Sequence, residues 1–293
     1  MELINILIQA FIQGLTEFLP VSSSGHLSVA QHFMDVDEGG MTVSVFLHMG
    51  TLLSICIAFR ETVWGMFKEF FLTLSDIFTL RFSPKEMNDD RKMLFMVILA
   101  TSLLVPVMLV KDFFTAPYAD GDIIFEGAAF IFTAIVLFMS DSCVKGIKKP
   151  RDIGVRDALT VGFFQIIALF PGVSRSGSTI SSGLFCGLSR KTAVTFSFML
   201  GIPAIAGAGL LEVRDLVKAS EAGDIAVGNI NWIVMAVGFL VSMTVGLFAI
   251  KLVKLLIKKE KFKIFAIYVM TLGVLCVVWG IFENVTGFRF RLG

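Results

Sequence analysis

Charge and histidine are both scarce in this sequence. Charged residues make up only 17% of the 293 positions, and only three residues are histidine. An average soluble domain carries about 25% charged residues. The formal net charge of +1 excludes a global attraction to nucleic acid. Apolar residues make up 56% of the chain and include 30 phenylalanines, so the composition indicates a membrane protein.

Cysteine is also rare. The four cysteines lie within or beside apolar segments, and no two have the spacing of metal ligands. We interpret them as small apolar side chains. The first 21 residues lack both a basic segment and a small-residue cleavage site, so no cleavable signal peptide is expected.

Long apolar runs predict an all-α polytopic membrane protein. Two runs, 3–19 and 155–170, each lead into a turn rich in proline, glycine and serine and then into a second short apolar segment. Interrupted helices are tolerated at membrane depth only inside protein or beside a wet cavity, so we expect two re-entrant helical hairpins. Six further runs reach the roughly 17–25 residues that cross a bilayer. These six predicted transmembrane helices are 43–59, 93–111, 123–143, 192–211, 232–250 and 264–282.

Basic residues predict the orientation of the chain. They concentrate in the connections 60–92, 145–157 and 251–263, which the positive-inside rule assigns to the cytoplasm. The connections 35–41 and 112–122 are mainly acidic and fit the outside. Both termini are therefore expected outside.

The two hairpins are related in sequence. Residues 13–26 read QGLTEFLPVSSSGH and residues 165–178 read QIIALFPGVSRSGS. At an offset of 152 the identical pairs are Gln13/Gln165, Phe18/Phe170, Val21/Val173, Ser22/Ser174, Ser24/Ser176 and Gly25/Gly177. We interpret residues 1–293 as one membrane domain with inverted-topology repeats, 1–144 and 150–283, whose hairpin tips meet near the midplane. An eight-span bundle without repeats is the alternative.

The hairpins also hold most of the polar groups predicted at membrane depth, where such groups are costly and are functional by default. The first hairpin supplies Gln13, Thr16, Glu17, Ser22, Ser23, Ser24 and His26, and the second supplies Gln165, Ser174, Arg175, Ser176, Ser178 and Thr179. Gln13 and Glu17 share one helix face because they are four residues apart.

These residue types suit phosphoryl transfer. Arg175 offers a planar fork of donors for phosphate oxygens. The hydroxyls and backbone N–H groups of Val173–Thr179 are expected just before a helix, whose dipole favours an anion. Glu17 can accept a proton or hold a hard divalent cation. Ser23 can act as a nucleophile when activated, and His26 can act as an acid or base.

Structural roles compete with these functional ones. Glu17 and Arg175 could form only a structural ion pair, and the hydroxyl groups of Ser22 and Ser24 could simply bond to helix carbonyls. His48, alone in an apolar run, is expected to be structural. Glu126 is expected to pack against a polar neighbour.

The segments QGLTEFLPVSSSGH and PGVSRSGST resemble the two signatures of the bacterial undecaprenyl-diphosphate phosphatases of the bacitracin-resistance type, and the span layout agrees over nearly the whole chain. The resemblance implies hydrolysis of undecaprenyl diphosphate to undecaprenyl phosphate and inorganic phosphate. That reaction recycles the lipid carrier for peptidoglycan synthesis, supports cell wall biogenesis and cell shape, and lowers bacitracin sensitivity. The resemblance also implies a plasma-membrane protein, a site open to the outer face, and a divalent cation, Mg²⁺ or Ca²⁺.

The resemblance also implies roles for individual residues. Gln13 and Glu17 match a motif in which many relatives have two carboxylates, so a metal site that needs both is in doubt here. Ser23 and His26 match the family serine and histidine. The nucleophile is one of these two, and we favour Ser23 with Glu17 or His26 as its base. Arg175 matches the phosphate-binding arginine. Further phosphate-binding residues are Ser22, Ser24, Ser174, Ser176 and Thr179, with Gln13 and Gln165 in support.

Two rival classes of protein share parts of this pattern. A polyprenyl-phosphate transporter or flippase would also have inverted repeats with broken helices, but a nucleophile, a base and an anion clamp exceed what binding needs. The acid-phosphatase type of membrane lipid phosphatase needs a later His-x3-Asp element, and no histidine follows His48. The preferred metal, the prenyl chain length and any homo-oligomer are left open.

Overall fold

The computed structural model describes residues 2–34, 40–81, 83, 87–107, 110, 113–114, 122–143, 145–221, 231–258 and 262–288. Within these ranges the chain is helical, with one isolated β-bridge between Lys148 and Leu188. The all-α prediction is therefore confirmed. The helices are α1 (Glu2–Thr16), α2 (Ser23–Met34), α3 (Gly40–Ala58), α4 (Arg60–Phe78), α5 (Asp89–Ser102), α6 (Leu104–Val107), α8 (Ile124–Asp141), η3 (Pro150–Asp152), α9 (Val155–Ile167), α10 (Arg175–Phe185), α11 (Arg190–Glu221), α12 (Trp232–Lys258) and α13 (Lys263–Thr286).

Both interrupted segments are helix–turn–helix pairs. The first is α1 and α2, and the second is α9 and α10. Each turn ends on a serine that caps the following helix. Ser22 has a left-handed φ of 72°, and its hydroxyl accepts from Gly25 N at 3.3 Å. Ser174 accepts from Gly177 N at 3.0 Å. A side-chain oxygen at this position satisfies a free N–H group of the first turn.

Four of the described helices, α8, α11, α12 and α13, are long and apolar enough to cross a membrane, and α3 with α4 makes a fifth candidate bent by 88°. The protein is therefore a multi-pass membrane protein, but the predicted count of six spans is not confirmed. The predicted span 93–111 differs most, because α5 ends at Ser102 and the short α6 follows it. The first turn of α5 also carries Asp89 and Asp90, which lower its mean hydropathy.

Helix α4 lies in a segment that the sequence presents only as a basic connection. Its charged residues keep its hydropathy below that of a span. They also attach it to α5, because Arg91 donates to Glu69 at 2.6 Å and to Asp76 at 2.7 Å. Exposed aromatic residues, such as Trp64 and Phe67, lie along the same helix. The combination is typical of a helix that lies in a membrane interface.

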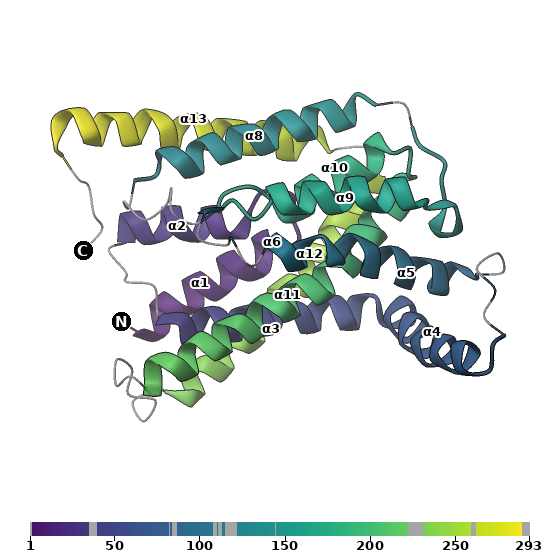
Figure 1. Ribbon diagram of the computed structural model, residues 1–293. Helices are drawn as coiled ribbons and strands as arrows, with labels where there is room; N and C mark the ends of the chain where they lie inside the picture. The colour runs from purple at the N-terminus through teal and green to yellow at the C-terminus, as the bar shows by residue number, and fades with distance from the viewer. Residues whose placement is uncertain are drawn as a thin grey trace.

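The packing brings distant parts of the chain together. Helix α12 packs against α1 and α3, α13 packs against α8, and α5 packs against α9. In Figure 1 the start of α1 and the end of α13 lie at the left, whereas the α4–α5 and α8–α9 connections lie at the right. The α4–α5 and α8–α9 connections thus lie opposite to the start of α1 and the end of α13, and the orientation of the chain in a membrane stays a prediction.

Candidate active site

The two turns meet, and aligned serines connect them. Gly172 N donates to the hydroxyl of Ser24 at 3.2 Å, and the hydroxyl of Ser176 donates to the Leu19 carbonyl at 3.0 Å. Each serine therefore bonds to the turn of the other hairpin. A Cβ on Gly25 would lie 2.9 Å from Gly172 Cα, so glycine permits this close approach.

Glu17 is the centre of the polar cluster between the turns. Its Oε1 accepts from Arg175 Nη2 at 2.8 Å. Its Oε2 accepts from the Ser23 hydroxyl at 2.7 Å and from Gln13 Nε2 at 3.0 Å. Glu17 is 8% exposed and the Arg175 side chain 16%, so the ion pair is largely shielded from water. The structure thus brings four predicted site residues together.

Local structure explains how these side chains converge. Glu17 continues the helical spacing of α1, because its N–H donates to the Gln13 carbonyl at 3.0 Å, and the two side chains share a face. Arg175 is the first residue of α10. A Cβ on Gly201 would lie 2.7 Å from Arg175 Nη1. Glycine at this position of α11 therefore leaves room for the guanidinium group.

Two polar atoms of the cluster have no partner. Gln13 Oε1 and Arg175 Nη1 are both buried and form no hydrogen bond. Buried polar atoms in proteins are nearly always paired, so an unpaired acceptor and an unpaired donor beside Glu17 need an explanation, and a bound ligand would supply one. An anionic oxygen would satisfy the arginine.

A divalent cation fits this cluster only in part. The described residues contain no group of three or more His, Cys, Asp or Glu side chains that could hold a metal. Glu17 is the one carboxylate of the cluster, and Gln13 Oε1 adds an unpaired amide oxygen. Mg²⁺ is commonly held by one or two carboxylates together with substrate phosphates. The donors therefore fit a cation shared with a phosphorylated ligand, not an all-protein cage.

His26 lies beside the cluster but bonds elsewhere. Its Nδ1 is 2.6 Å from the Ser22 carbonyl oxygen and its Nε2 is 2.8 Å from the Tyr268 hydroxyl. Its ring stacks on Tyr268 with a centroid distance of 5.6 Å and packs edge-on against Phe130. Both nitrogens are occupied, and neither is bonded to Ser23 or Glu17.

The remaining predicted residues lie around the cluster. The Thr179 hydroxyl is 2.6 Å from that of Ser197, and the hydroxyls of Ser174 and Ser176 are 3.3 Å apart. Gln165 is 2% exposed, and neither polar atom of its side chain has a hydrogen-bond partner.

Two residues expected to be structural have polar partners. Glu126 accepts from Ser28 at 2.5 Å, which confirms the expected polar neighbour. His48 lies near Ser44 and Glu212, with Nδ1 3.8 Å from Glu212 Oε2.

Comparison with known proteins identifies the family. Residues 6–275 match the family model described as bacitracin resistance protein BacA. The chain is 35% identical over 286 residues to an undecaprenyl-diphosphatase of Alkaliphilus metalliredigens, which covers 96% of this chain and all of that protein. It is 34% identical to an undecaprenyl-diphosphatase of Methanobrevibacter smithii, over 94% of this chain and 96% of the relative. Undecaprenyl-diphosphatase 4 of Bacillus thuringiensis is 35% identical, over 94% and 97% of the two chains.

The chain belongs to the BacA family.

Three residues of this BacA-family site are not apparent from the hairpin motifs. Tyr268 holds His26 from a helix 242 residues away in sequence. Thr133 accepts from Ser174 N at 3.1 Å, and Gly201 leaves room for Arg175. Only Tyr268 carries a signal in the sequence, because it is one of two tyrosines in a chain with 30 phenylalanines.

Proposed function

We propose that this protein hydrolyses undecaprenyl diphosphate to undecaprenyl phosphate and inorganic phosphate. The observation that carries the proposal is Glu17, which accepts from the Ser23 hydroxyl at 2.7 Å and from Arg175 at 2.8 Å. A base, a hydroxyl nucleophile and an anion clamp therefore share one small volume. The family and the relatives named undecaprenyl-diphosphatase supply the substrate.

Arg175 binds the terminal phosphate of the lipid in this proposal. Its Nη2 stays on Glu17, while the unpaired Nη1 donates to a phosphate oxygen. The fixed guanidinium group stabilises the charge that develops on the transferring phosphoryl group. Ser176 and Thr179 hold the first turn of α10 in place, through the Leu19 carbonyl and Ser197.

Ser23 is the nucleophile in this proposal and Glu17 is its base. The Ser23 hydroxyl oxygen attacks the terminal phosphorus and its proton passes to Glu17 Oε2, which already accepts it. The bond from phosphorus to the bridging oxygen breaks, and undecaprenyl phosphate leaves. Water then attacks the phosphoserine, Glu17 returns the proton to Ser23, and inorganic phosphate is released.

Glu17 and Gln13 Oε1 would hold the divalent cation together with the diphosphate oxygens. When bound, the cation would neutralise charge on the diphosphate. His26 is assigned a positioning role, because it connects α2 to α13 through Tyr268. This places the family histidine at the edge of the site.

Helix packing supports the inverted repeat. By order along the chain, α1 corresponds to α9, α3 to α11, α5 to α12 and α8 to α13. Helix α1 packs on α12 while its counterpart α9 packs on α5, and α3 packs on α12 while α11 packs on α5. Two pairs of counterparts, α8 with α13 and α3 with α11, also pack on each other. Such reciprocal packing is expected of two halves related by a pseudo-two-fold axis.

The orientation follows from the basic connections. The protein lies in the bacterial plasma membrane. With the connections 60–92, 145–157 and 251–263 in the cytoplasm, both termini lie outside. The two hairpins enter from opposite sides as re-entrant elements, with six spans around them. The diphosphate then reaches Arg175 from the outer face, while the prenyl chain lies among the helices.

Phosphate release from a prenyl diphosphate by purified protein in detergent tests the function. We expect turnover that falls when a chelator removes divalent cations and returns when Mg²⁺ or Ca²⁺ is added. A transporter or flippase would bind the lipid without releasing phosphate. Absence of release from folded, metal-supplemented protein would favour that alternative.

A further inference from the structure

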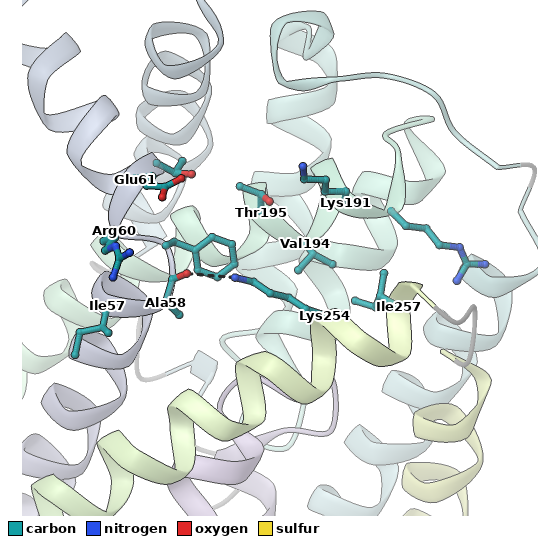
Figure 2. A pocket seen from close by; sticks show the side chains of 12 residues that line it. Ile57, Ala58, Arg60, Glu61, Lys191, Val194, Thr195, Lys254 and Ile257 are labelled. Carbon is teal, nitrogen blue, oxygen red and sulfur yellow. Dashed lines mark hydrogen bonds between the residues drawn. The ribbon is translucent and has the colours of Figure 1, made fainter.

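A cavity lies away from the paired turns. Its volume is about 960 Å³, and it opens between the α3–α4 bend, the first turn of α11 and the end of α12 (Figure 2). The residues that matter here are Arg60, Lys191 and Lys254, which are basic, and Ile57, Val194 and Ile257, which are apolar. None of these residues belongs to the hairpin motifs.

The lining of this cavity is positively charged. Arg60 and Lys191 form no ion pair within the described part of the chain. Lys254 Nζ donates to the Ala58 carbonyl at 3.3 Å, a bond drawn in Figure 2. The same Nζ lies 3.6 Å from the centre of the Phe59 ring. A fourth cation, Arg190, is paired with Asp141. Glu61 is the one acidic residue of the lining, so three cations face a single carboxylate.

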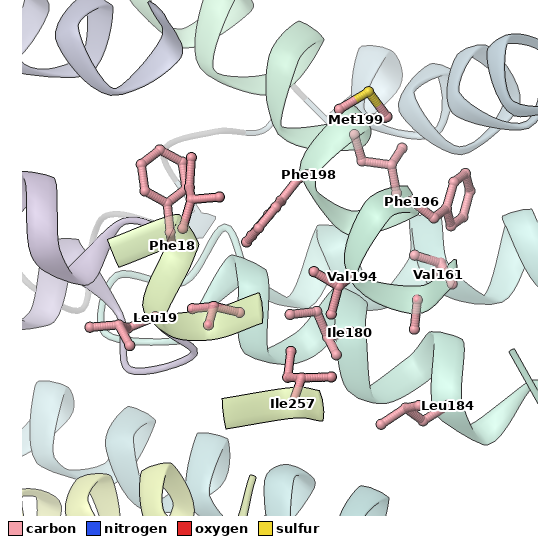
Figure 3. Packing of buried hydrophobic residues seen from close by; sticks show 14 of the residues in the cluster. Phe18, Leu19, Val161, Ile180, Leu184, Val194, Phe196, Phe198, Met199 and Ile257 are labelled. Atoms are coloured by element: carbon pink, nitrogen blue, oxygen red, sulfur yellow. The ribbon is translucent and has the colours of Figure 1, made fainter. Parts of the chain in front are cut away.

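Packed rings separate this cavity from the candidate active site. Phe59, on the cavity wall, meets Phe198 edge-on at a centroid distance of 5.4 Å. Phe198 meets Phe18 at 5.7 Å, and Phe18 is the neighbour of Glu17. All three rings are buried, and Figure 3 shows Phe18 and Phe198 in the core. Neither Glu17 nor Arg175 lines the cavity.

We propose that this cavity is a second phosphate site, which binds a phosphate group carried on an apolar chain. Arginine and lysine form charge-assisted hydrogen bonds to phosphate oxygens, and Arg60 and Lys191 are free to do so. The apolar wall formed by Val194 and Ile257 can bury the beginning of a hydrocarbon chain. Arg60 and Lys254 belong to the basic connections 60–92 and 251–263. Three cations in one cavity beside an apolar wall suit a membrane lipid with one phosphate. Inorganic phosphate would use the same cations but not the apolar wall.

Binding of farnesyl phosphate to purified full-length protein in detergent tests this inference. The cavity variant combines Arg60→Gln, Lys191→Gln and Lys254→Gln. The control variant combines Lys68→Gln, Lys251→Gln and Lys263→Gln, which removes the same charge from basic residues outside the cavity. We expect one of two saturable binding steps to weaken about tenfold or more in the cavity variant only. Phosphate release should stay within about twofold in both variants, which checks folding.

Two further ligands separate the sources of phosphate. Farnesol should bind equally to both variants. If inorganic phosphate competes for the weakened step, the site takes phosphate from water; if it does not, the site takes lipid-borne phosphate. Equal binding of farnesyl phosphate to the cavity and control variants would overturn the proposal.

Photo-crosslinking covers the case in which the cavity variant fails to fold. A diazirine analogue of farnesyl phosphate should label peptides that contain Val194 or Ile257 in the unaltered protein. Labelling confined to the paired turns would contradict a second site.

Discussion

Arg175 Nη2 donates to Glu17 Oε1 at 2.8 Å across a separation of 158 residues. This ion pair joins the turn of one hairpin to the turn of the other. Removing one partner of a buried ion pair typically costs about 3–5 kcal/mol, because the other charge is left unpaired. Variants of the pair must therefore separate lost chemistry from lost stability.

Arg175→Lys is expected to lower turnover about 10²–10³-fold, although it keeps the charge beside Glu17. Lysine has a single nitrogen and cannot bond to Glu17 and also place a donor where the unpaired Nη1 lies. Arg175→Ala should be at least as inactive and also less stable. Phosphate release and thermal unfolding of both variants check this, and near-normal turnover in either would refute the assigned role.

Gly201→Ala tests the space around the guanidinium. The new Cβ would lie 2.7 Å from Arg175 Nη1, whereas a Cβ on Gly207, in the same helix, meets nothing within 4 Å. Both substitutions favour the helix by about 1 kcal/mol, so Gly207→Ala is a matched control. We expect Gly201→Ala to lose about tenfold or more in turnover and Gly207→Ala to lose none. Equal activity of the two variants would mean that the arginine need not be held so closely.

Glu17→Gln should reduce turnover far more than Gln13→Ala. Glu17 is the base in the proposed step, and a general base typically contributes about 10²–10⁴-fold. Gln13 donates to Glu17 at 3.0 Å and would add one neutral amide oxygen to the cation. Gln13→Glu adds a second carboxylate beside Glu17. If it lowers the cation concentration needed for half-maximal turnover, Gln13 lies beside the cation. Equal losses from Glu17→Gln and Gln13→Ala would instead indicate a structural pair.

The sequence predicted much of this site because its information is local. The serine-rich turns, the aligned repeats and the helical spacing of Gln13 and Glu17 are all visible in short segments. Their meeting was expected from the predicted inverted repeat, whose hairpin tips would lie near the midplane. The close approach of Gly25 to Gly172 is consistent with that reasoning.

The sequence did not predict features that depend on long-range packing. Tyr268 lies in an apolar run, and nothing local shows that its hydroxyl faces His26. Helix α4 was not predicted, because its charged residues resemble those of a polar connection. The structure shows that two of them, Glu69 and Asp76, pair with Arg91 of α5. The predicted count of six spans is not confirmed, since α5 begins in an acidic turn and ends at Ser102.

The geometry favours Ser23 over His26 as the nucleophile. Ser23→Ala is expected to lower turnover by about 10³-fold or more, and acid quenching of the unaltered protein should trap phosphoserine in the peptide that contains Ser23. His26→Gln should retain activity within about tenfold, because both histidine nitrogens are held by Ser22 and Tyr268. Phosphohistidine at residue 26 would reverse this assignment.

One diphosphate can reach both hairpins only if their tips meet, and a pair of cysteines can test that contact. A Cβ on Gly177 would lie 3.4 Å from Pro20 Cβ, close to the roughly 3.5–4.5 Å of a disulfide. Pro20→Cys with Gly177→Cys should therefore form a disulfide under oxidation. Pro20→Cys with Gly187→Cys should not, because a Cβ at Gly187 has no neighbour within 4 Å.

Labelling of intact cells tests the orientation of these hairpins in the membrane. With Cys143 replaced, Thr286→Cys should react with an impermeant thiol reagent and Lys149→Cys should not, because positive connections stay in the cytoplasm. Both positions are exposed, so burial does not explain a difference. Reversed labelling together with an intact Pro20–Gly177 crosslink would keep the paired turns but move the diphosphate site to the cytoplasmic face. The protein would then act on lipid delivered from inside the cell.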